Sequence, residues 1–198
     1  MTEDAIVATS WWMILPLGIL GSLLHFLFDW THHNRIAAVF GAVNESYWEH
    51  IKIAVWPVAL LQLVLFAAGG WRQPSFVPAA TIALYAVPVS MIGLVFLYKR
   101  LTRRNVLGLD IAVFLLVIGI AQTVFVLVLT ELAAGWATIV VAAAFLVALV
   151  ASFLWFTLHP PEEPDVFIDP IARTYGLDAH PDLHTRRAPD SRSEDGAR

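Results

Sequence analysis

Long apolar runs separated by short polar turns fill the first 158 residues of the chain. A helix needs roughly 20 apolar residues to cross a bilayer. Runs near this length predict spans at about 11–30, 47–69, 77–98, 109–132 and 136–158. The stretch IAAVFGAV, between the first two runs, is too short to cross. The pattern predicts an all-α, polytopic membrane protein with five transmembrane helices and a short re-entrant or interfacial segment between spans 1 and 2.

Composition supports a membrane class. The chain is 59% hydrophobic and only 14% charged, whereas soluble domains average about 45–50% apolar and about 25% charged residues. The absence of cysteine excludes disulfides, thiolate metal sites and cysteine nucleophiles. Because of this apolar composition, the expected partners are membrane lipids and not nucleic acid. A homo-oligomer is also possible. The N-terminus has no basic region before the first run, so we expect a permanent span and not a cleaved signal peptide.

Basic residues predict the orientation of the chain in the membrane. In a five-span topology, 11 of the 12 Lys and Arg residues fall on the side of the C-terminus, and Arg72 alone falls on the other. Because cytoplasmic loops carry the excess of Lys and Arg, we expect a multi-pass protein of the cell (inner or plasma) membrane with its N-terminus outside and its C-terminus in the cytoplasm. The polar tail, 159–198, is expected to dock through its first half and to be disordered in its last part.

Ionisable residues gather between the end of the first predicted span and the start of the second. Such groups are costly at this depth, so they need partners, water or a ligand. The predicted topology places them all on the cytoplasmic side. They are His25, Asp29, His32, His33, Glu45, Glu49 and His50.

The pair His25 and Asp29 is spaced i, i+4, which places both side chains on one face of a helix. A nitrogen and an oxygen at this spacing can bind one divalent ion, such as Zn²⁺, and His50 is the candidate third ligand. The alternative is a structural role, in which a His–Asp hydrogen bond neutralises both groups inside the bundle.

Glu45 and Glu49 have the same i, i+4 spacing and are the candidate catalytic residues. One of them would act as general base while the metal lowers the pKa of a bound water, for hydrolysis of a lipid-like substrate. Alternatively, Glu49 completes a capping box with Ser46 at the start of span 2, and Lys52 pairs with either acid.

Two other functions remain open. The cluster could take up protons or cations in coupled transport, with Gln62 and Gln122 lining a polar path through spans 2 and 4. It could instead be a closed hydrogen-bond network in a structural or partner-binding protein. The two glutamines would then form interhelical hydrogen bonds. Asp110, in the first turn of span 4, would interact favourably with the helix dipole.

Three elements of the chain resemble a bacterial and archaeal family of integral membrane proteins of unknown function. The elements are L-H-x-x-x-D, V-N-E-S-x-W-E-H and D-P-x-x-x-x-Y-G, and the resemblance runs from residue 16 to about 177. It implies a five-span fold, no assigned activity, and one site built from all three elements. His32 and His33 do not match the pattern. The matching residues are His25 and Asp29; Asn44, Glu45, Ser46, Trp48, Glu49 and His50; and Asp169, Pro170, Tyr175 and Gly176.

Overall fold

The computed structural model describes residues 1–104, 106–161, 165–169 and 173–179, and this part of the chain is almost entirely helical. Three 3₁₀ turns, η1 (Gly70–Arg72), η2 (Asp165–Phe167) and η3 (Gly176–Ala179), accompany the α-helices. The α-helices are α1 (Glu3–Trp12), α2 (Ile14–His25), α3 (Leu27–Trp30), α4 (Arg35–Phe40), α5 (Tyr47–Ala67), α6 (Phe76–Thr102), α7 (Leu107–Glu131) and α8 (Trp136–Leu158).

Four of these helices, α5 to α8, are long and apolar enough to cross a membrane. The pair α1 and α2 passes the same test together, as one span bent by 52°. The short helices α3 and α4 lie between this pair and α5. The prediction of an all-α, polytopic membrane protein is therefore confirmed, with four spans or, counting the bent pair, five.

The first span starts earlier and ends earlier than its hydropathy predicts. It begins at Glu3, where the side chain of Thr2 accepts a hydrogen bond from the backbone of Ala5, and α2 ends at His25. Acidic residues in a first helical turn are favoured by the helix dipole, although they look like a polar loop in a hydropathy pattern. The bend follows from Pro16, which has no N–H to bond the carbonyl of Trp12 one turn earlier.

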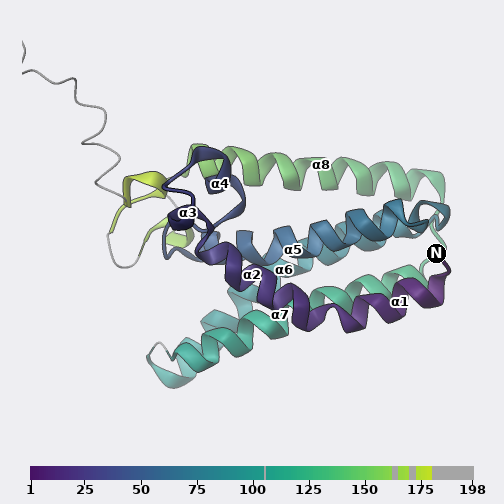
Figure 1. Cartoon of the computed structure of the whole chain (residues 1–198). Helices are drawn as coiled ribbons and strands as arrows, with labels where there is room; N and C mark the ends of the chain where they lie inside the picture. Colours follow the sequence, from purple (N-terminus) through teal and green to yellow (C-terminus); the bar gives the residue numbers. More distant parts are fainter. Residues whose placement is uncertain (105, 162–164, 170–172, 180–198) are drawn as a thin grey trace, which may run out of the picture.

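The spans form a bundle with two distinct ends (Figure 1). Helix α6 packs against α5, α7 and α8, while α2 packs against α5 and α7. At one end, the amino group of Met1 donates to the carbonyl of Ala68, and Ser75 Oγ donates to the carbonyl of Leu132. Figure 1 shows α3, α4 and the C-terminal segment together at the opposite end. The polar stretch between the first two spans is thus separated from the N-terminus by the length of the bundle.

Candidate functional site

The loop between α4 and α5 is shaped by Ser46 and Asn44. Ser46 is the N-cap of α5, and its Oγ accepts from the backbone N–H of Glu49 at 3.4 Å. The Ser46 N–H donates to Asn44 Oδ1 at 2.9 Å, so it is not bonded by Glu49 as a full capping box requires. Half of the predicted box is formed, and the Glu49 carboxylate is used elsewhere.

Glu49 and Lys52 form a buried ion pair inside the first two turns of α5. Their side chains lie 2.5 Å apart, Glu49 Oε2 to Lys52 Nζ, and the two residues are 2% and 0% exposed. Glu49 Oε2 also accepts from the Val43 N–H at 2.9 Å, and Lys52 Nζ donates to the Ala38 carbonyl at 2.7 Å. This closed network ties α4 and its following loop to α5. It does not favour Glu49 as a general base, because the carboxylate is buried and already paired.

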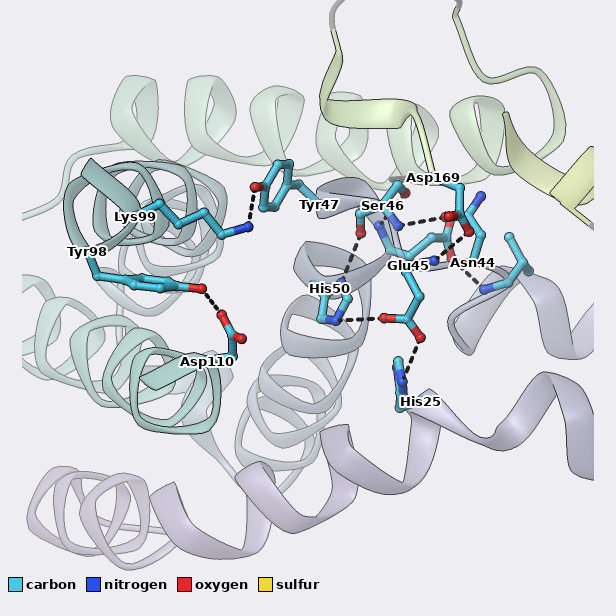
Figure 2. Close-up of polar contacts among 12 residues, drawn as sticks. His25, Asn44, Glu45, Ser46, Tyr47, His50, Tyr98, Lys99, Asp110 and Asp169 are labelled. Carbon is cyan, nitrogen blue, oxygen red and sulfur yellow. Dashed lines mark hydrogen bonds and ion pairs between the residues drawn. The ribbon is translucent and has the colours of Figure 1, made fainter. Parts of the chain in front are cut away.

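Glu45 lies between two imidazoles (Figure 2). Its Oε1 is 3.3 Å from His25 Nε2, and its Oε2 is 3.7 Å from His50 Nε2. The other nitrogen of His50, Nδ1, is 2.9 Å from the Ser46 carbonyl, so it carries a proton and donates. His25 Nδ1 is buried and has no hydrogen-bond partner among the described residues. The three side chains come from the end of α2, the loop before α5 and the first turn of α5.

The surroundings of Glu45 keep its carboxylate ionised. Its hydrogen bond with His25 holds the pKa of the Glu45 carboxyl below the ordinary value, and the charges of His25 and His50 add to this effect. Partial burial and the charge of Asp169 oppose it. A carboxylate that accepts from His25 Nε2 fixes the ring orientation and keeps the proton on that nitrogen. Glu45 is thus an orienting counter-charge for His25, and a weak proton acceptor at neutral pH.

These side chains open into a pocket of about 250 Å³ that His25, Asp29, Asn44, Glu45 and Asp169 line together with apolar residues. The C-terminal segment closes one wall of this pocket. Asp169 Oδ2 accepts from the Glu45 N–H at 3.1 Å (Figure 2). Asn44 Nδ2 donates to the Gly176 carbonyl at 3.1 Å.

An aromatic contact fixes the same segment to α5. Phe167 is buried, and its ring centroid is 4.9 Å from that of Trp48. All three motif elements of the sequence therefore meet at one place, as the resemblance implies. Pro170 of the third element lies outside the described residues, as does the last part of the tail, 186–198, for which disorder is predicted.

Two of the three predicted metal ligands lie together, since the ring centroids of His25 and His50 are 5.5 Å apart, but Asp29 does not join them. The contact of Asp29 is with His33 Nε2 at 3.4 Å, and its side chain is mostly exposed. The helix is interrupted at Phe26, between α2 and α3, so Asp29 no longer follows His25 in one continuous helical register. Among the described residues, no group of three or more His, Asp or Glu side chains could hold an ion. The donor geometry does not support the predicted zinc site of His25, Asp29 and His50.

The remaining polar residues of the spans lie apart from the pocket. The Tyr98 hydroxyl donates a short hydrogen bond to Asp110, which joins α6 to α7 away from His25 (Figure 2). Gln62 and Gln122 are buried, and their amide atoms have no hydrogen-bond partner among the described residues. The interhelical hydrogen bonds expected for these two glutamines are therefore not formed. Sequence reasoning from spacing also missed the link from Asn44 to Gly176, for which the only signal was the shared motif pattern.

Comparison with known proteins places the chain in a family and assigns no activity. No curated protein matches it, and no solved structure matches it either. One family profile covers residues 1–177, which include the pocket, the bent first span and α5 to α8. The chain belongs to this family, the family of unknown function DUF6512.

Proposed function

We propose that this multi-pass protein lies in the cell membrane with its pocket at the cytoplasmic face. The distribution of basic residues supports this orientation. The C-terminal end of α6, which is the end farther from the N-terminus of the chain, carries Lys99, Arg100, Arg103 and Arg104, whereas Arg72 lies at the opposite end of the bundle. Near the pocket, Phe26 stacks on Trp30 with ring centroids 5.8 Å apart, and both side chains are exposed. Exposed aromatic rings are typical of the membrane–water interface, which supports a pocket at the level of the lipid headgroups.

We infer that the pocket is an acid–base site in which His25 transfers the proton and Glu45 orients the imidazole ring of His25. The single observation that carries this proposal is the 3.3 Å contact between His25 Nε2 and Glu45 Oε1 beside a pocket that both residues line. An imidazole titrates near neutral pH, so it suits proton transfer better than a carboxylate whose pKa is lowered. A carboxylate that holds an imidazole in one orientation is the arrangement found in many hydrolytic enzymes.

The proposed position of the pocket supports one class of substrate. A pocket at headgroup level, with polar walls and apolar spans beside it, suits an amphiphile whose polar group enters while its chains stay in the bilayer. We therefore propose a lipid-like substrate that is hydrolysed at its headgroup: water attacks, His25 takes the proton of that water and passes it to the leaving group, and Glu45 holds the His25 ring. The ion pair of Glu49 and Lys52 would then have a structural role, because it holds in place the loop that carries Glu45.

The test is lipid turnover by the purified protein in vesicles made from a total polar lipid extract, followed by mass spectrometry. The wild-type chain should convert at least one lipid, and His25→Ala should lower the rate by about 100-fold or more, since positioned acid–base groups contribute about 10²–10⁴-fold. His32→Ala is the matched control, because His32 is an exposed histidine outside the pocket. It should retain the wild-type rate.

Two results would refute the enzymatic proposal. One is equal turnover by wild type and His25→Ala. The other is proton or cation flux across the vesicle membrane with no lipid converted, which would instead favour transport.

A further inference from the structure

Several polar side chains are buried within the spans, in the half of the bundle farther from the pocket, and three of them belong to α1, α5 and α7. Ser10 of α1, Gln62 of α5 and Gln122 of α7 are 0%, 3% and 0% exposed. None of them lines the pocket around Glu45. The proposed acid–base chemistry therefore gives no reason for their presence in a largely apolar interior.

The three residues lie at similar depths. Helix α1 begins, and α5 and α7 end, at the same end of the bundle, which the contacts of Met1 with Ala68 and of Ser75 with Leu132 hold together. From the ends of their helices and a rise of 1.5 Å per residue, Ser10, Gln62 and Gln122 are about 10, 8 and 14 Å deep. Helix α7 contacts both α1 and α5.

Their hydrogen-bonding capacity is not met by the protein. The amide nitrogen and oxygen of Gln62 and of Gln122 have no partner among the described residues. Ser10 Oγ donates to the Ile6 carbonyl at 2.9 Å, which leaves its lone pairs able to accept. A buried amide without a partner costs about 1–3 kcal/mol, and bulk water does not reach the interior of a bilayer to relieve this cost.

The first span is interrupted close to Ser10. The bend of 52° falls at Met13, three residues after Ser10. Many membrane proteins build their interior polar sites where a spanning helix is interrupted, because the interruption frees backbone groups from the helical pattern. The bend is an observation independent of the two glutamines, and Met13, about 15 Å deep by the same rise per residue, lies near the depth of Gln122.

We propose that Ser10, Gln62 and Gln122 form an interior binding site for ordered water at the bend of the first span. The donor and acceptor chemistry selects the ligand. A cation would satisfy only the amide oxygens, and an anion only the amide nitrogens, whereas water both donates and accepts. Buried waters in proteins typically make about three hydrogen bonds to groups that the protein leaves unpaired, and three side chains can provide them here.

The first test is NMR of the protein labelled with ¹⁵N-glutamine and reconstituted in nanodiscs. The chain has only three glutamines, Gln62, Gln73 and Gln122, so three side-chain amide signals are expected. Gln62 and Gln122 should show nuclear Overhauser cross peaks to long-lived water. Gln73, in the turn after η1, serves as the reference for exchange with bulk solvent. Absence of water cross peaks at both Gln62 and Gln122 would overturn the proposal.

The second test is a thermal stability cycle with Gln62→Leu, Gln122→Leu and the double variant. Each single change should lower the apparent Tm by roughly 2 to 12 °C, because it leaves the water and the remaining amide short of a partner. The double variant should be no less stable than either single variant. Gln73→Leu is the control and should leave the Tm unchanged. Single changes that raise the Tm, with additive effects in the double variant, would show two independent amides and no shared site.

Discussion

Replacing Lys52 by methionine should destabilise the protein more than any change to an exposed charge. Lys52→Met keeps the length of the side chain and removes the ammonium group that lies 2.5 Å from Glu49. Glu49 would then be a buried carboxylate that still accepts from the N–H of Val43 but has lost the charge of Lys52. Removing one partner of a buried ion pair typically costs about 3–5 kcal/mol, because the other charge is left uncompensated.

The cost translates into a measurable shift. A loss of about 1 kcal/mol lowers Tm by about 2–4 °C in a chain of this size, so Lys52→Met should lower the apparent Tm by roughly 6 to 20 °C. Glu49→Gln should have an effect of similar size, since it leaves the ammonium group without its counter-charge. The assay is differential scanning fluorimetry of the detergent-purified protein, which contains tryptophan in several helices as the reporter.

The double variant Glu49→Gln with Lys52→Met should be more stable than either single variant. No buried charge remains in it, and the glutamine can still accept from the Val43 N–H, so its Tm should lie above that of either single variant. Lys99→Met is the matched control, because Lys99 is a partly exposed lysine of α6 that contacts the Tyr47 hydroxyl. It should shift the Tm by no more than about 2 °C. Costs that add in the double variant would refute a network closed around the two charges.

Two further predictions follow from the same structure. The pKa of the Glu45 carboxyl is lowered in the folded state, so its contribution to stability is present above the unfolded pKa of about 4.3 and is lost as pH falls through the folded value. The Tm difference between wild type and Glu45→Gln should therefore shrink below about pH 4. A pH-independent difference would contradict this. Gly21→Ala should lower the Tm, because the added Cβ would lie 2.8 Å from the Ile53 carbonyl and 2.6 Å from Phe114, whereas Gly119→Ala, with nothing within 4 Å, should be neutral or stabilising. Equal Tm values for the two alanine variants would argue against close packing of α2 on α5.

The spanning helices could be predicted from the sequence because they depend on length and apolar composition alone. The start of the first span could not, since Glu3 and Asp4 lower the hydropathy of a segment that is nevertheless helical. Its bend required recognition that Pro16 removes a hydrogen bond within an apolar run. Hydropathy reports how much apolar surface a segment carries, and it does not report where the helix begins or breaks.

The candidate site was predictable as a cluster and not in its pairings. Glu45 pairs with His25, and Glu49 pairs with Lys52, although helical spacing suggested one shared set of ligands. The break at Phe26 and the path of the loop that carries Glu45 decide these pairings, and both are tertiary features. Burial of Lys52 is equally invisible in the sequence, because a hydropathy scale counts a lysine as costly whether or not a carboxylate lies beside it.

The central claim is that His25 and Glu45 act as one acid–base unit, and a double-mutant cycle on lipid turnover tests it most directly. The rates to compare are those of wild type, His25→Ala, Glu45→Gln and the double variant in the same vesicles. Residues that act as a unit show strongly non-additive effects, so the double variant should be no slower than His25→Ala alone. Losses that multiply in the double variant would show that the two side chains act independently, which would contradict the claim.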